Sequence, residues 1–184
     1  MKDLSMHIMD IFQNSVSASA SLITLDIVED THDNLLRLDF TDNGKGMTIE
    51  MAKKVTDPFF TTRKTRNVGL GLPLLKQNAE RTGGFFKLES EEGKGTKVTA
   101  QFVRDHLDRP VFGDIPGAIL LTVIANPDIV FTYSHKKDEK KYYFSTLEVK
   151  EALGDVPLND PLVYHYLHEM IAENLNEIGV SLSS

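Results

Sequence analysis

Two pairs of alternating segments constrain the fold of this chain more than any other feature. In residues 22–29, and again in residues 35–41, apolar and polar side chains alternate with a period of two, which is typical of half-buried strands. Residues 85–90 and 96–104 repeat this pattern around a turn that contains two glycines. Because a short turn joins each pair, both pairs predict antiparallel hairpins and a mostly antiparallel sheet.

Helical patterns surround these hairpins. Apolar residues recur every three or four positions in residues 3–18. A short helix is expected over residues 49–56, and a longer one from Pro73 to Gly83, which would end it. The pattern predicts an α/β (α+β) two-layer sandwich in which the helices lie on one face of the sheet.

The pattern breaks near residues 104–110 and then restarts. After the break we expect a helix, a strand hairpin and a long final helix, at residues 117–126, 128–135 with 141–149, and 161–178. This order divides the chain into a domain of residues 1–105 and a small α+β extension of residues 106–184. No low-complexity linker separates the two parts, so they should pack together.

Composition excludes several classes of function. The 184 residues are 41% hydrophobic and carry a net charge of −7 without a long Lys/Arg cluster, which argues against nucleic acid as a partner. Without cysteine, neither a disulfide nor a thiolate zinc site can form. The N-terminus lacks the apolar block of a signal peptide, and the longest apolar run, residues 118–125, is too short to cross a bilayer. We therefore expect a cytoplasmic protein with no membrane partner.

The stretch TDNGKGM, residues 41–47, places a carboxylate where the core is expected. Alternate residues of the preceding strand share the core-facing side, and the period of two puts Asp42 there as well. Asp-Asn-Gly is also a common turn sequence, and taken alone that interpretation has the larger weight. The second glycine favours a ligand site, since Gly44 and Gly46 together would let a flat molecule approach the backbone.

A basic segment leads into a second glycine pair. Arg63 and Lys64 precede Gly69, Leu70 and Gly71 and then the start of a helix, an arrangement in which backbone N–H groups face an anion. The stretch matches neither the P-loop nor the dinucleotide fingerprint. A solvated basic run beside a helix cap is the alternative.

Taken in order, the stretches DIFQNSVSA, TDNGKGM, DPFFTTR, GLGLPLLKQ and GKGTKVTAQF resemble the GHKL superfamily of ATPases. This superfamily includes the ATP-binding domains of sensor histidine kinases, gyrase-type topoisomerases and mismatch-repair ATPases. The resemblance covers nearly all of residues 1–105, and the ordered set of motifs is specific although each motif alone is not. It implies the Bergerat-type ATP-binding fold, a two-layer sandwich, with ATP and Mg²⁺ as ligands.

The resemblance also implies a role for each matched position. Asn14 corresponds to the asparagine that coordinates Mg²⁺, and Asp42 to the aspartate that accepts a hydrogen bond from the adenine amino group. Thr96 corresponds to the threonine that closes the adenine pocket. The remaining matched positions would flank the base, belong to a lid over residues 59–68 or offer groups to the phosphates: Gly44, Gly46, Met47, Arg63, Lys64, Gly69, Leu70 and Gly71.

Asp10, one turn before Asn14, departs from the family pattern. Hydrolytic members carry a glutamate here that orients water, and histidine kinases usually carry an asparagine. The shorter aspartate could act as a weaker base, act through a second water or help to hold Mg²⁺, and the sequence leaves these roles open. Nothing before residue 1 supplies the helices that carry a phosphoacceptor histidine, so we do not expect a complete sensor kinase.

Histidines elsewhere offer weaker candidates. His106 lies in HLDRP, which faintly resembles a phosphoacceptor box, but chance is the better explanation. His165 and His168 have a spacing that could bind metal with Glu169, yet no further ligand is evident and surface positions are favoured. His7 could border the phosphates or pack inside the protein, and the sequence gives both equal weight.

These features predict a stand-alone bacterial Mg·ATP-binding protein that is an ATPase or a kinase of a separate protein, as the anti-sigma-factor kinases of this superfamily are on serine. The alternative is a nucleotide-gated module in which residues 106–184 contact a partner with little or no turnover. A looser resemblance to ATP-binding proteins encoded near iron hydrogenase subunits suggests a setting. The sequence does not identify the protein partner or phosphoacceptor, and it leaves a homodimer open.

Overall fold

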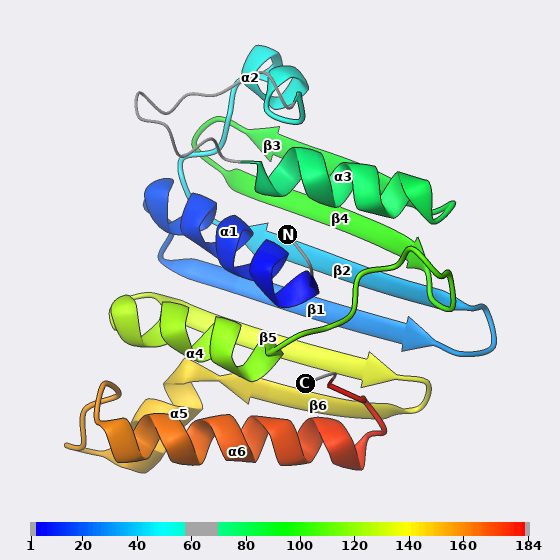
Figure 1. Cartoon of the computed structure of the whole chain (residues 1–184). Coiled ribbons are helices and arrows are strands. Elements are labelled where there is room, and N and C mark those ends of the chain that lie inside the picture. The colour runs from blue at the N-terminus through cyan, green and yellow to red at the C-terminus, as the bar shows by residue number, and fades with distance from the viewer. Residues whose placement is uncertain (1–2, 58–69, 183–184) are drawn as a thin grey trace.

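The computed structural model describes residues 3–57 and 70–182, and their strands form one six-stranded sheet (Figure 1). The strand order is β3-β4-β2-β1-β5-β6. Neighbouring strands pair antiparallel except for β1 and β5, which are parallel. The strands are β1 (Leu22–Asp30), β2 (Leu35–Asp42), β3 (Phe85–Glu91), β4 (Gly95–Val103), β5 (Val130–Lys137) and β6 (Lys140–Ser145).

Helices α1, α3, α4 and α6 lie side by side over one face of this sheet (Figure 1). The predicted two-layer α/β sandwich is therefore confirmed. The helices are α1 (Leu4–Ser17), α2 (Ile49–Lys54), α3 (Gly71–Arg81), α4 (Ile115–Ala125), α5 (Thr146–Leu153) and α6 (Pro161–Glu177). None of the helices in the described part of the chain combines the length and apolar character needed to cross a membrane.

The core lies between the helices and the sheet. In β1 the alternate residues Ile23, Leu25 and Ile27 are at most 1% exposed, while the residues between them are half-buried on the opposite face. Helix α1 contributes its apolar stripe, which includes Ile8 and Phe12. The stripe fixes the rotation of α1 and thus decides which of its polar side chains reach the edge of the core.

The strands that follow residue 105 continue the first sheet instead of forming a sheet of their own. Strand β5 pairs in parallel with β1, from Leu22 opposite Val130 to Glu29 opposite Lys137. Helix α4 packs against α1 on the covered face. Local patterns indicate a second unit that packs against the first, but they do not predict this strand pairing, because segments about a hundred positions apart leave no trace of their pairing in such patterns.

One predicted element is wrong in part. Residues 141–149 were expected to be a single strand, but β6 ends at Ser145 and α5 begins at Thr146. The Ser145 hydroxyl accepts a hydrogen bond from the N–H of Leu147, which is the arrangement of a helix N-cap. The β-branched and aromatic residues of this stretch favour a strand, so the sequence pattern did not reveal the helix N-cap at Ser145.

A buried chain of polar side chains joins β5 to the first part of the sheet. The Tyr133 hydroxyl lies 2.8 Å from Nδ1 of His135. Nε2 of His135 lies 3.0 Å from Oε1 of Glu29. Nε of Arg104 donates to Oε2 of Glu29 at 3.3 Å. Burial acts to raise the pKa of Glu29, but the hydrogen bond with His135 and the nearby cations lower it overall. Burial lowers the pKa of His135 despite the opposing effect of Glu29. Tyr133 therefore donates to neutral His135, which donates to the Glu29 carboxylate.

Candidate functional site

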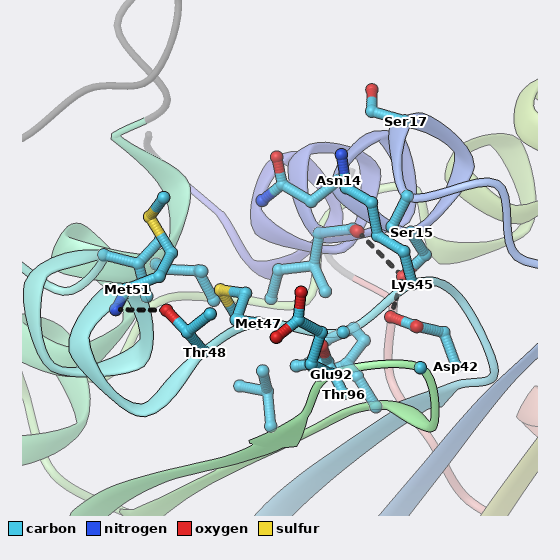
Figure 2. A pocket seen from close by; sticks show the side chains of 18 residues that line it. Asn14, Ser15, Ser17, Asp42, Lys45, Met47, Thr48, Met51, Glu92 and Thr96 are labelled. Carbon is cyan, nitrogen blue, oxygen red and sulfur yellow. Dashed lines mark hydrogen bonds between the residues drawn. The ribbon is translucent and has the colours of Figure 1, made fainter.

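A pocket of about 840 Å³ opens where β2 ends and β4 begins, under the C-terminal half of α1. Its size and its mostly apolar walls fit a small organic ligand. Figure 2 shows Asn14 and Ser15 projecting from α1 and Asp42 and Thr96 from the sheet side. The lining residues are Ile11, Asn14, Ser15, Ser17, Ala18, Phe40, Asp42, Lys45, Gly46, Met47, Thr48, Met51, Val55, Leu72, Glu92, Gly93, Thr96 and Val98.

Asp42, the last residue of β2, is the polar anchor of this pocket. Its Oδ2 accepts a hydrogen bond from the Ser15 hydroxyl at 2.7 Å, and its Oδ1 accepts one from the Gly44 N–H at 2.9 Å. The second bond is the turn contact that the Asp-Asn-Gly sequence predicts. Because each carboxylate oxygen has two lone pairs, Asp42 can still accept a hydrogen bond from a ligand while both protein donors hold its orientation.

Ser15 is a site residue that the sequence analysis did not single out. It is 4% exposed and lies on the apolar stripe of α1, next to Asn14. A hydroxyl on a buried helix stripe needs a partner, and Asp42 supplies it across the pocket floor. A polar serine at a position that the helical period places on the apolar face of α1 was the signal in the sequence that could have identified Ser15.

The two glycines of the Asp42 turn are required by the protein itself. Gly46 has a φ of +66°, and a Cβ there would lie 2.0 Å from the carbonyl oxygen of Glu91. A Cβ on Gly44 would lie 2.8 Å from the Cβ of Ala18. The loop is thus fitted between the end of α1 and the β3–β4 turn, and only Gly46 of the pair lines the pocket. The expected approach of a flat ligand is not needed to explain either glycine.

Thr96 lies directly opposite Asp42 in the pairing of β2 with β4, as a joint role in one pocket requires. The Thr96 hydroxyl is 2.9 Å from Oγ of Ser90. Ser90 donates to the carbonyl of Gly95 and accepts from the N–H of Met47. With its own proton used in this way, Ser90 accepts from Thr96, which leaves the lone pairs of the Thr96 oxygen available in the pocket.

Asn14 and Asp10 lie one turn apart on α1 but face different surroundings. Asn14 lines the pocket. Asp10 is directed toward the start of α3, where a Cβ on Gly71 would lie 1.9 Å from its Oδ2. Gly71 is the first residue of α3, and no side-chain hydrogen bond from Leu70 caps the helix. Backbone N–H groups at this helix start are therefore available to an anion.

Several predicted residues lie outside the described part of the chain: Arg63, Lys64, Gly69 and the rest of the lid segment 59–68. Among the described lining residues, Lys45 is the one cation and Asp42 and Glu92 are the anions. The described walls alone are therefore not attractive to a polyanionic ligand.

Three of the histidines considered above have clear neighbours in the structure. His7 is fully buried between α1 and α3, and burial lowers its pKa to about 4, so the packing interpretation holds. His165 pairs with Glu169 at 3.4 Å, and His168 is 2.9 Å from Asp114. No group of three metal-binding side chains is found in residues 3–57 and 70–182.

Comparison with known proteins extends these observations. A family model described as "Histidine kinase-, DNA gyrase B-, and HSP90-like ATPase" matches residues 2–106. A putative sensor protein of Shewanella frigidimarina is 35% identical over 98 residues, which cover 52% of this chain and 15% of that protein. The sensor histidine kinase ZraS of Escherichia coli is 27% identical over 96 residues, which cover 52% of this chain and 20% of that protein. The chain thus spans a small part of the length of either relative.

Among solved structures, the Aquifex aeolicus MutL ATPase domain complexed with ADP matches with a TM-score of 0.50 and 14% sequence identity. That match covers 92% of this chain and 70% of the other chain. At this identity the likeness concerns the fold, and it includes the strands that follow residue 105.

Proposed function

The chain belongs to the family of histidine kinase-, DNA gyrase B- and HSP90-like ATPases, and from this premise we propose that it binds Mg·ATP in the pocket under α1 and acts on a separate protein as an ATPase or kinase. The observation that carries the proposal is Asp42, held by Ser15 and the Gly44 N–H at the floor of a pocket of about 840 Å³.

The adenine is assigned to the Asp42 end of the pocket. Its exocyclic amino group would donate to the Asp42 carboxylate, which keeps acceptor capacity there. Thr96 offers a second hydroxyl, and Met47 supplies part of the apolar wall. A carboxylate that accepts from the amino group discriminates against a base with a carbonyl at that position.

The phosphates are assigned to the other end, between Asn14 and the uncapped start of α3 at Leu70 and Gly71. The residues present fit a Mg²⁺ ion, because Asn14 brings a hard oxygen ligand to the pocket wall and nucleotide phosphates supply others. When bound, Mg²⁺ neutralises charge on the β- and γ-phosphates. That charge matters here because the described walls carry two anions and one cation.

Catalysis is assigned to Asp10, which precedes Asn14 by one turn and faces the helix start. The proposal gives it the task of accepting a proton from, or orienting, the group that attacks the terminal phosphate. The runner-up function is a nucleotide-gated binding module with little or no turnover, in which residues 106–184 contact the partner. The continuity of their strands with the pocket-forming sheet supports this alternative.

Binding is tested by calorimetry on Asp42→Asn. We expect no measurable ATP affinity in a folded protein, since the amide presents a poorer acceptor to the adenine amino group. The matched control is Asp33→Asn, the same chemical change at an exposed turn position, which should bind ATP like the wild type. Unchanged affinity in Asp42→Asn would remove the adenine assignment.

The mode of action is tested with γ-labelled ATP in a lysate of the source organism. Label on another protein indicates a kinase, and release of free phosphate alone indicates an ATPase. ATP binding without either product favours the binding module.

A further inference from the structure

Two buried polar atoms meet the start of α3 without a hydrogen-bond partner among the described residues. They are Nδ1 of His7 and Oδ2 of Asp10, three positions apart on α1. Both border Gly71. A Cβ on Gly71 would lie 1.9 Å from the Asp10 oxygen. A hydrogen-bonding contact with the Gly71 backbone raises the pKa of His7 against the larger, opposite effect of burial, but this contact lacks the geometry of a full hydrogen bond from Nδ1. Unpaired buried polar atoms are rare in native proteins, so the pair calls for an explanation.

The neighbouring Asn78 decides which atom of the imidazole carries hydrogen. Its amide Nδ2 lies 3.1 Å from Nε2 of His7. An amide nitrogen is a donor only, so Nε2 must accept, and in the neutral ring the hydrogen is then on Nδ1. His7 is fully buried, and the lowered pKa agrees with a neutral ring near pH 7. The interface therefore holds a buried donor, His7 Nδ1–H, and a buried acceptor, Asp10 Oδ2.

We propose that His7 is a positioning residue for Asp10, with one buried water molecule linking its Nδ1–H to Asp10 Oδ2 beside Gly71. A buried water needs two to four polar partners, and the Gly71 backbone supplies a third. The linkage fixes Asp10 against the first turn of α3. The effect of this linkage on turnover rests on the proposed function, because it acts through Asp10 as the catalytic residue. The linkage between His7 and Asp10 does not depend on that function.

The linkage is tested first in nucleotide-free protein by nitrogen NMR of the His7 ring. We expect the Nδ1–H tautomer, and we expect the Nδ1 resonance to move when Asp10 is replaced in Asp10→Ala. The control Asp33→Ala, at an exposed turn, should leave it in place. An Nε2–H tautomer, or an Nδ1 resonance indifferent to Asp10→Ala, would overturn the proposal and leave the Gly71 backbone as the partner of His7.

Two substitutions of His7 then separate positioning from packing. In His7→Asn the amide nitrogen can occupy the place of Nδ1, whereas in His7→Gln the amide group reaches only the place of Nε2. We expect His7→Asn to retain turnover within roughly threefold, and His7→Gln to lose roughly tenfold or more in kcat at unchanged ATP affinity. Equal kcat in the two variants, with both folded by thermal unfolding, would overturn the positioning role.

Failure of the proposed function looks different. If wild-type protein binds no ATP in calorimetry, the ATPase or kinase assignment falls while the NMR result still decides the linkage. If wild type binds ATP but gives no product with or without lysate, the positioning role in turnover is wrong.

Discussion

The hydrogen bond from Ser15 to Asp42 lends itself to a quantitative test by Ser15→Ala. A hydrogen bond to a charged group contributes about 1.5–3 kcal/mol, and this one is short at 2.7 Å with Ser15 only 4% exposed. Alanine favours a helix over serine by about 0.5 kcal/mol, which offsets part of the loss. We expect a net loss of about 1–2.5 kcal/mol in the free energy of unfolding. For a chain of this size that corresponds to a fall of about 2–10 °C in Tm.

The same substitution frees the Asp42 carboxylate to rotate, so its orientation must be fixed anew when adenine binds. We expect roughly three- to tenfold weaker ATP binding, which corresponds to about 1 kcal/mol. Urea denaturation measures the first effect and calorimetry the second. Ser17→Ala, at the exposed last residue of the same helix, is the control for helix propensity in the unfolding measurement alone, because Ser17 also lines the pocket. If Ser15→Ala is as stable as Ser17→Ala and binds ATP with wild-type affinity, the bond does not organise the site.

Three further predictions concern other parts of the protein. Asn14→Ala should weaken Mg·ATP binding in calorimetry. Asp10→Asn should lower phosphate release or transfer, while its binding of ATP persists or tightens. Equal loss of binding in both variants would favour a structural or metal-holding Asp10. A chain that ends at residue 105 should still bind ATP, because all the described residues that line the pocket lie between residues 11 and 98. It should be less soluble and unfold at a lower temperature, because β1 and α1 lose the elements that cover them. A soluble, folded truncation without ATP affinity would contradict this. Burial lowers the pKa of His7 from its ordinary value of 6.5 to about 4 in the folded protein. The unfolded state therefore binds more protons between these two values, so stability that is present above pH 6.5 is lost as pH falls toward 4. The loss in the free energy of unfolding that His7 causes over this pH range is about 3 kcal/mol. Urea denaturation should show a smaller loss over the same range in His7→Gln, because glutamine does not titrate.

Local sequence patterns determined most elements but not how all of them assemble. The two hairpins, the helix of residues 3–18 and the position of Asp42 on the core-facing side follow from periodicities of 2 and 3.6 residues. The parallel pairing of β1 with β5 does not, because either strand could have formed the edge of a sheet. Hence local patterns did not predict that the strands of residues 106–184 join the first sheet.

Site residues divide in the same way. Asn14, Asp42 and Thr96 belong to ordered motifs, and they do line one pocket. Ser15 escaped attention because a serine beside a conspicuous amide reads as an ordinary helix position. The buried partners Glu29 and His135 escaped because they lie on strands whose pairing could not be foreseen. Asp10 and Gly71 are adjacent because α1 packs on α3. The two residues lie far apart in the sequence, so no local pattern could predict this contact.

The parallel pairing of β1 with β5 also has a consequence for how the chain is made. Residue 30 ends β1, and its second partner strand is complete only at residue 137. At synthesis rates of about 5–20 residues per second, one side of β1 waits for roughly 5–20 s before β5 has been synthesised. During that interval its backbone N–H and C=O groups form an open edge to which other extended chains can pair. Synthesis is thus the stage at which β1 most needs to be shielded from other nascent chains.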